Sequence, residues 1–131
     1  MRFVDTSFWV ALLMARDRHH EMARTLWSGG SGSLLTTNHV VGETWTFLRR
    51  RAGHGAAVSF LNAAEQSPRL ATLHADESLE AEARRWLRRH DEREFSFVDS
   101  VSFAVMRRRR IAEVLAFDGD FSAAGFVELR P

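Results

Sequence analysis

Short apolar segments that end at an aspartate and pass at once into a helical pattern restrict the possible folds of this chain more than any other feature. FVDTSFW at 3–9 is one such segment, and AFDGDF at 116–121 is another. FVDSVSF at 97–103 has the same form. A strand that is followed within one or two residues by a helix is half of a βαβ unit, so the pattern favours a parallel sheet covered by helices.

The rest of the chain alternates between the two patterns in the same way. Strands are expected at 2–4, 33–36, 70–74, 113–117 and 126–129, and helices at 6–16, 20–27, 38–51, 55–65, 76–90 and 100–110. Asn38 is the expected N-cap of the helix that ends near Arg51. Neither an internal repeat nor a long linker divides the sequence. We therefore predict a single domain over residues 1–131, an α/β fold with three layers (α/β/α) and a mostly parallel central sheet.

Composition excludes several classes of protein. With 45% hydrophobic and 27% charged residues, the chain is typical of a globular domain and not of a disordered or membrane-spanning one. The absence of cysteine excludes disulfides and thiolate zinc sites. Asp5 interrupts the apolar start, and no small-residue cleavage site follows, which argues against a signal peptide. We expect a cytoplasmic protein with no membrane partner.

The positive charge of the chain is carried by arginine alone. The formal net charge is +1, and none of the 18 basic residues is lysine. The arginines gather at 49–51, at 84–89 and at 107–110. Such clusters suit bidentate contacts with phosphate, but arginines at helix ends also meet the negative end of the helix dipole and pair with nearby glutamates. For any one cluster we favour the second explanation.

Several carboxylates follow the predicted strands. Asp5 and Asp118 lie at carboxyl ends, where ligands bind in parallel sheets whose strand order reverses, so the two could face one crevice. Taken singly, each of Asp5, Asp99 and Asp118 precedes a helix or turn and is explained as a cap. Asp120, in the DGD segment, is likewise explained by a turn. The caps and the shared crevice are competing interpretations at this stage.

Glu43 is harder to explain by local structure. It lies three residues after Val40 and four before Phe47, on the apolar stripe of the predicted helix. A carboxylate on a buried face costs several kcal/mol unless it has a partner. An arginine is one candidate partner. A metal ion shared with the aspartates is the other, and oxygen ligands alone would select a hard cation, Mg²⁺ or Mn²⁺.

These segments together resemble a known family. The chain is similar to PIN-domain ribonuclease toxins of the VapC kind, which belong to bacterial toxin–antitoxin pairs. The resemblance runs from end to end and rests on FVDTSFW with Asp5, NHVVGETWTFL with Glu43, FSFVDSVSFAVM with Asp99, and LAFDGDFSAAGF with Asp118 and Asp120. One departure is Ser100, where many relatives have a small apolar residue.

The resemblance implies a PIN-like fold and Mg²⁺- or Mn²⁺-dependent endoribonuclease activity that inhibits translation. HDEREFSFVD and FDGDFSAAGF are similar to the branch that attacks ribosomal RNA at the sarcin–ricin loop, whereas other branches cut tRNA. The implied partners are an rRNA or tRNA substrate, a cognate antitoxin whose tail covers the acidic pocket, and a second copy of the chain in a homodimer.

For phosphodiester hydrolysis we expect Asp5 and Asp99 to be the primary metal ligands. Asp118 would complete the ligand set or hold a water molecule, Glu43 would steer the attacking water, and Asp120 is a weaker candidate in the same group. A divalent cation would activate that water and clamp a phosphoryl oxygen. The expected products carry a 5′-phosphate and a 3′-hydroxyl. Thr6 and Ser7, beside Asp5, either assist the site or cap the first helix.

Two alternatives stay open from the residues. Histidines, among them His19 and His20, could serve as acid and base and leave a cyclic phosphate. No HExxH or GxSxG motif is present, however, and we interpret most histidines as surface or cap residues. The other alternative is a catalytically silent PIN-fold module that binds RNA or protein, against which the presence of all the acids argues.

Overall fold

Five short parallel strands form one sheet at the centre of the computed structural model, which describes residues 1–131. The strands are β1 (Arg2–Val4), β2 (Leu34–Thr37), β3 (Leu70–Leu73), β4 (Glu113–Leu115) and β5 (Val127–Glu128). Their order across the sheet is β3-β2-β1-β4-β5, and every neighbouring pair is parallel. The predicted α/β fold with a parallel central sheet is confirmed.

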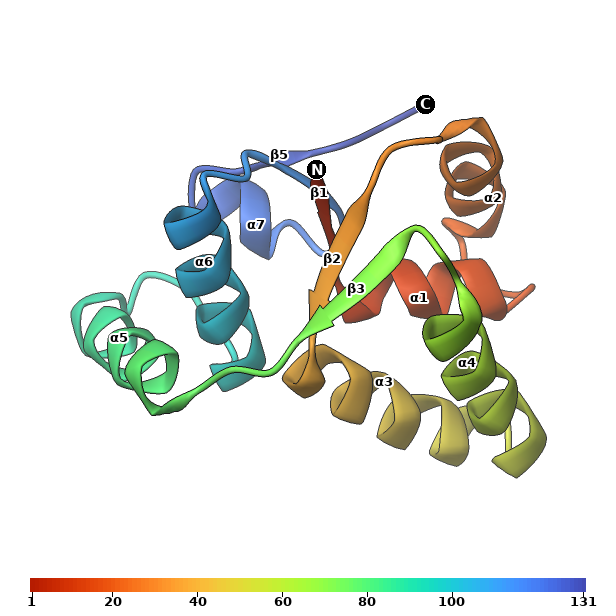
Figure 1. Cartoon of the computed structure of the whole chain (residues 1–131), viewed down its shortest axis with the longest axis horizontal. Helices are drawn as coiled ribbons and strands as arrows, with labels where there is room; N and C mark the ends of the chain where they lie inside the picture. Colours follow the sequence, from red (N-terminus) through yellow and green to blue (C-terminus); the bar gives the residue numbers. More distant parts are fainter.

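Seven helices surround the sheet. They are α1 (Thr6–Leu13), α2 (His20–Gly29), α3 (Asn38–Arg51), α4 (His54–Gln66), α5 (Glu77–Arg89), α6 (Phe97–Arg109) and α7 (Asp120–Ala123). In Figure 1, α5, α6 and α7 lie on one side of the sheet, α1, α2 and α4 lie on the other, and α3 passes below the carboxyl ends of β2 and β3. None of these helices has the length and apolar character needed to cross a membrane.

The hydrophobic core lies on both faces of the two central strands. Phe3 and Val4 of β1 and Val114 of β4 are completely buried. They belong to one continuous cluster of 25 buried hydrophobic residues that reaches into α1, α3 and α6. Full burial of one such side chain stabilises a fold by about 1.5–3 kcal/mol. This core holds the ends of β1 and β4, and therefore the residues that follow them, in a rigid frame.

The strand order reverses between β1 and β4. Phe3 of β1 is in register with Leu35 of β2 on one side and with Val114 of β4 on the other. The chain builds the sheet outward from β1 to β2 and β3, and then returns to the opposite side of β1 with β4. At such a switch point the following segments diverge and leave a crevice beyond the carboxyl ends of the strands. Asp5 follows β1 directly, whereas Ala116 and Phe117 lie between the end of β4 and Asp118.

Several predicted boundaries and caps were wrong. The first helix ends at Leu13 and not at 16, because Met14 takes an extended conformation. The N-cap of α3 is Thr37, whose side chain accepts a hydrogen bond from the backbone of Val40, whereas Asn38 accepts one from Ala75. The fourth strand ends at Leu115, and the short helix α7 had not been predicted.

Candidate active site

Asp5 lies at the carboxyl end of β1 and caps helix α1. Its Oδ2 atom accepts hydrogen bonds from the backbone N–H of Ser7, at 3.1 Å, and from the Ser7 hydroxyl, at 2.8 Å. The Ser7 hydroxyl oxygen in turn accepts a bond from the Phe117 N–H, at 3.0 Å, so the ends of β1 and β4 are tied together. Burial raises the pKa of Asp5 well above its ordinary value, and the negative charge of Asp118 adds to this rise. The carboxylate of Asp5 therefore caps α1 and also lines the crevice, so the two interpretations of this residue are compatible.

Asp99 is not the residue before a helix, as the sequence had suggested, but lies in the first turn of α6. Ser96 is the N-cap, and the two residues form a capping box in which each side chain accepts a bond from the other's backbone N–H, at 3.0 and 3.1 Å. Asp99 is 6% exposed. Burial raises its pKa to about 7, with contributions from the charges of Asp120 and Asp118. The box fixes the carboxylate near those of Asp118 and Asp120.

Asp118 lies in the tight loop that joins β4 to α7, and Asp120 is the first residue of α7. Asp118 Oδ1 accepts a bond from the Asp120 N–H at 3.1 Å, and burial raises the pKa of Asp118 to about 6. Gly119 between them has a φ of 82° and leaves only 3.0 Å from a would-be Cβ to the Arg93 side chain, so a larger residue there would be strained. Arg93 donates to Asp120 Oδ1 from Nε, at 2.6 Å, and also to the Asp118 carbonyl oxygen, at 3.0 Å.

Three of the predicted carboxylates converge closely. One oxygen each of Asp99, Asp118 and Asp120 can be chosen so that all lie within 4.8 Å of one another. Asp5 and Asp118 line the same cleft, of about 450 Å³, together with Ser7 and Glu43. The predicted primary pair, Asp5 and Asp99, is thus connected through Asp118, whose negative charge raises the pKa of both.

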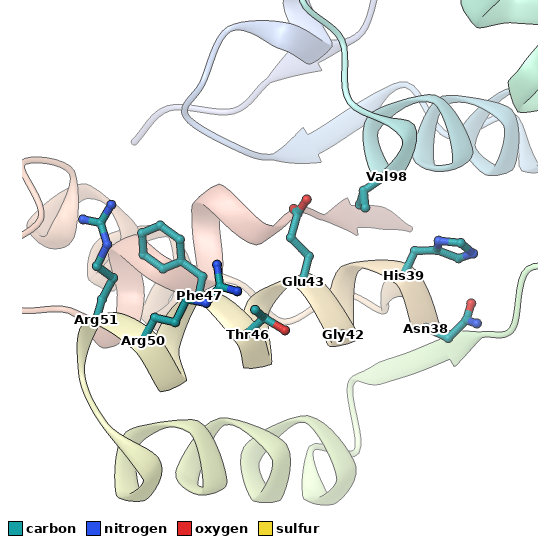
Figure 2. A pocket seen from close by; sticks show the side chains of 9 residues that line it. All are labelled: Asn38, His39, Gly42, Glu43, Thr46, Phe47, Arg50, Arg51 and Val98. Atoms are coloured by element: carbon teal, nitrogen blue, oxygen red, sulfur yellow. The ribbon is translucent and has the colours of Figure 1, made fainter.

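Glu43 is half-buried on α3 and makes no hydrogen bond or ion pair within the protein. Of the two partners considered for Glu43, the buried arginine is therefore contradicted. It lies on a face of α3 that borders two clefts, and in Figure 2 its carboxylate points away from the helix towards Val98 of α6. Contact with solvent in these clefts explains why no protein partner is needed.

The acid site has the chemistry of a site for a hard cation. Asp5, Asp99 and Asp118 each use one carboxylate oxygen for a backbone N–H, and the second oxygen has no partner in the protein. Carboxylates with like-charged neighbours and free oxygens, two of them buried and Asp118 open to solvent, fit Mg²⁺ or Mn²⁺, which prefer oxygen ligands. Asp120 differs, since its charge is already balanced by Arg93.

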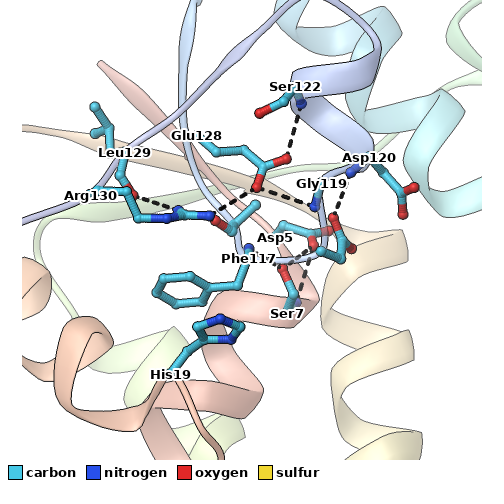
Figure 3. Close-up of polar contacts among 12 residues, drawn as sticks. Asp5, Ser7, His19, Phe117, Gly119, Asp120, Ser122, Glu128, Leu129 and Arg130 are labelled. Carbon is cyan, nitrogen blue, oxygen red and sulfur yellow. Dashed lines mark hydrogen bonds and ion pairs between the residues drawn. The ribbon is translucent and has the colours of Figure 1, made fainter.

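The sequence did not reveal three residues that shape this site. The side chain of Glu128 in β5 is only 3% exposed and accepts bonds from the backbone N–H groups of Gly119 and Ser122, at 3.3 and 3.0 Å (Figure 3). Arg93 is the second. His19 is the third: it lines the acid cleft, and its ring stacks on Phe117 with centroids 4.6 Å apart. His19 and His20 had been considered in the sequence as a possible acid and base, while most histidines were interpreted as surface or cap residues; the place of His19 in the acid cleft had not been predicted.

The fold and the site define the class of protein. Residues 2–127 match the PIN domain family, so the chain belongs to this family. The predicted resemblance is confirmed. Among its relatives is the 23S rRNA-specific endonuclease VapC20 of Mycobacterium tuberculosis, which is 56% identical over 135 residues that cover 100% of this chain and 99% of VapC20.

Solved structures agree with this assignment. The crystal structure of M. tuberculosis VapC20, described as a sarcin–ricin loop cleaving toxin, superimposes with a TM-score of 0.95 at 54% identity, over 100% of both chains. FitAcB from Neisseria gonorrhoeae, at 19% identity, covers 98% of this chain and 96% of its own with a TM-score of 0.70. This more distant likeness shows the shared fold only.

Proposed function

We propose that this protein is a metal-dependent endoribonuclease that hydrolyses a phosphodiester bond in the sarcin–ricin loop of 23S rRNA and acts as the toxin of a toxin–antitoxin pair. The observation that carries the proposal is the group of acids beyond the switch point, in which Asp118 converges with Asp99 and shares a cleft with Asp5. Each of these three carboxylates has one oxygen anchored and one free. The substrate is inferred from the 56% identity to a 23S rRNA-specific endonuclease.

Each carboxylate has a role that follows from its position. Asp5, Asp99 and Asp118 would hold Mg²⁺ or Mn²⁺ with their free oxygens, while their anchored oxygens keep the side chains from turning. When bound, the cation neutralises charge on the phosphoryl oxygens and lowers the pKa of water. Glu43, which has no partner in the protein, orients the attacking water. Asp120 balances Arg93 and thereby keeps the Asp118 loop in place.

Two partners belong to the same proposal. VapC20 is described as a toxin, and a toxin of this kind requires an antitoxin that blocks it in the cell. A cognate antitoxin that covers the acid cleft would meet this need. The homodimer stays a prediction from the family resemblance, and light scattering of the purified protein would test it.

Cleavage of total bacterial RNA would test the activity. Purified protein, freed of antitoxin, would be incubated with the RNA in Mg²⁺ or Mn²⁺, beside a sample with EDTA and the variant Asp99→Asn, and the new ends would be mapped. We expect one dominant cut in 23S rRNA with a 5′-phosphate, absent from both controls.

Other outcomes would contradict the proposal in different ways. Cleavage that survives EDTA, or that leaves a cyclic phosphate, would contradict the carboxylate mechanism and direct attention to histidines such as His19. A discrete cut in tRNA would keep the mechanism and replace the substrate. Binding of RNA without any cleavage would favour a catalytically silent module.

A further inference from the structure

A second cleft, of about 670 Å³, adjoins the acid cleft along helix α3. Its floor is one face of this helix from Asn38 to Arg51, with Val98 of α6 across from it (Figure 2). Glu43 and Phe47 line both clefts, so the two are continuous. At 1.5 Å per residue this face is about 20 Å long, which leaves room for several nucleotides beside the acid site.

The two ends of this second cleft differ in how their polar groups are satisfied. At one end, His39 is bonded to Glu80 at 2.8 Å, and the side chain of Asn38 accepts a bond from the backbone of Ala75 at 2.9 Å. At the other end, Arg50 and Arg51 are exposed and form no ion pair. Arg51 only lies over the Phe47 ring, 5.1 Å from its centroid. The structure thus leaves two guanidinium groups free where the cleft is open.

Several other arginines near the surface are engaged within the protein. Arg107 and Arg108 pair with Glu82, and Arg93 pairs with Asp120. Arg49, the neighbour of Arg50, is exposed and unpaired like it but lines neither cleft. The unpaired arginines that line the two clefts are therefore Arg50 and Arg51, at the end of α3, and Arg18, in the acid cleft itself. Arg49 offers a matched control for Arg50 and Arg51.

We propose that Arg50 and Arg51, with Phe47 between them and the carboxylates, form a subsite for the RNA strand next to the bond that is cleaved. This inference rests on the proposed function. The acid site repels the RNA backbone, so the strand needs cations that hold it on the enzyme. Arg50 and Arg51 bind phosphates within a few nucleotides of the reacting one, because Arg50 lies two helical turns, about 10 Å, from Glu43.

Phe47 adds a contact of a different kind. Its ring is half-buried and borders the passage from the acid cleft to the arginines. An unpaired base that leaves the acid site along this passage meets an aromatic face, and stacking of the base on such a face favours binding. The subsite therefore favours a single-stranded or loop segment over a regular duplex, whose bases are already stacked.

The salt dependence of RNA binding tests the subsite directly. The probe is a fluorescent RNA stem–loop with the sarcin–ricin sequence, and the proteins carry Asp99→Asn so that the RNA stays intact. Each phosphate contact with single-stranded RNA contributes about 0.7 to the slope of log K against log salt concentration. Loss of both contacts in Arg50→Ala/Arg51→Ala lowers the magnitude of this slope by about 1.4. Between 50 and 200 mM salt, the protein that keeps both arginines therefore loses about sevenfold more RNA affinity than the double variant. Arg49→Ala leaves the slope essentially unchanged.

Cleavage by the corresponding active proteins separates this inference from the proposed function. We expect the double variant to show a raised KM with kcat nearly unchanged, and Arg50→Lys/Arg51→Lys to recover part of the affinity, since lysine keeps the charge but not the guanidinium fork. If the wild type cleaves RNA and the double variant behaves like Arg49→Ala in both assays, the subsite is wrong and the proposed function stands. An acidic protein segment as the true occupant would give this same result.

Two further outcomes complete the test. If no RNA is cleaved but the double variant still lowers the binding slope, the subsite is supported and the proposed catalysis is contradicted. If Arg49→Ala lowers the slope as much as the double variant, binding reflects overall charge, and the subsite is overturned. Because Arg50 and Arg51 are exposed, both substitutions leave the hydrophobic core intact.

Discussion

The acid site and the arginine end of α3 border the same continuous cleft, yet they are built in opposite ways. Asp5 and Asp99 are buried, anchored by backbone N–H groups, and have raised pKa values. Arg50 and Arg51 are exposed and have no ion-pair partner. The first region is rigid before any ligand arrives, whereas the second is free to adapt.

This difference separates two tasks of an RNA-cleaving enzyme. Chemistry needs groups in fixed positions, and buried like charges destabilise the fold until a cation balances them. Binding of a long, flexible RNA strand depends on positive charge carried by long, mobile side chains more than on fixed geometry. Substitutions in the acid site should therefore change kcat and stability, and substitutions at the arginine end should change KM and salt dependence.

The largest expected effect is on catalysis in the acid site. Asp99→Asn keeps the size of the side chain and an oxygen for the Ser96 N–H but removes the charge that would hold the cation. We expect kcat to fall by about 10²–10³-fold or more, which single-turnover cleavage of the stem–loop RNA would measure. A fall in kcat of less than tenfold, with Mg²⁺ dependence retained, would remove Asp99 from the ligand set.

The raised pKa values of Asp99 and Asp118 predict an unusual dependence of stability on pH in the metal-free protein. The pKa of Asp99 is about 7 and that of Asp118 about 6 in the folded chain, against about 4 when unfolded. Between these values the folded state binds more protons than the unfolded state, so the free energy of unfolding falls as pH rises from about 4 to 7. For Asp99 alone the fall amounts to a few kcal/mol, at about 1.4 kcal/mol per pKa unit. Asp118 adds less, because its side chain is exposed and solvent screens its charge.

Urea unfolding in EDTA at a series of pH values would measure this fall. Asp99→Asn should flatten the curve and make the protein more stable than wild type at pH 8, although it is less active. Mg²⁺ should stabilise the wild type more at pH 8 than at pH 5. Stability that instead rises steadily from pH 4 to 7 would show that these carboxylates are not destabilised by burial.

A smaller effect is expected from the loop that carries Asp118. Glu128 holds the Gly119 and Ser122 N–H groups, so Glu128→Ala leaves both without a partner. We expect kcat to fall by about 10–100-fold, as for other groups that support metal ligands, and the free energy of unfolding to fall by about 1–3 kcal/mol. Steady-state kinetics and urea unfolding would measure the two effects.

Glu113→Ala is a matched control for this variant. Glu113, the first residue of β4, lies at the end of the strand away from the site and pairs with Arg2 at 3.4 Å near the surface. Such pairs contribute about 0–1 kcal/mol to stability. Equal losses of activity in Glu113→Ala and Glu128→Ala would mean that the loop is not specifically supported by Glu128.

The smallest effect is expected at the far end of the second cleft, where polar groups are already satisfied within the protein. Glu80→Ala breaks the 2.8 Å bond to His39. Because both side chains are partly exposed, we expect the free energy of unfolding to fall by less than about 1 kcal/mol, with kcat/KM for the stem–loop RNA within about twofold of wild type. A loss of affinity as large as that of Arg50→Ala/Arg51→Ala would extend the RNA path to this end.

Much of the fold could be predicted from the sequence because its signals are local. Alternation of short apolar strands and amphipathic helices identified the α/β class, and the segments around Asp5, Glu43, Asp99 and Asp118 carried the family resemblance. Caps and boundaries were less predictable. Ser96, not Asp99, is the N-cap of α6, and Thr37, not Asn38, is the N-cap of α3. Several neighbouring polar residues can cap a helix, and tertiary contacts decide which of them does.

The sequence by itself determined which acids are present, on which kind of element each lies, and that an aspartate follows both central strands. Only the tertiary structure decided that Asp118 stands between Asp5 and Asp99, that Arg93 balances Asp120, and that Glu43 opens into solvent. It also placed Glu128 against the loop at Gly119, nine residues earlier in the sequence. Arg50 and Arg51 remain without an ion pair, whereas Arg107 and Arg108 pair with Glu82. The reason is physical: local patterns specify elements and their faces, whereas the burial and charge around a side chain depend on which distant elements pack against it.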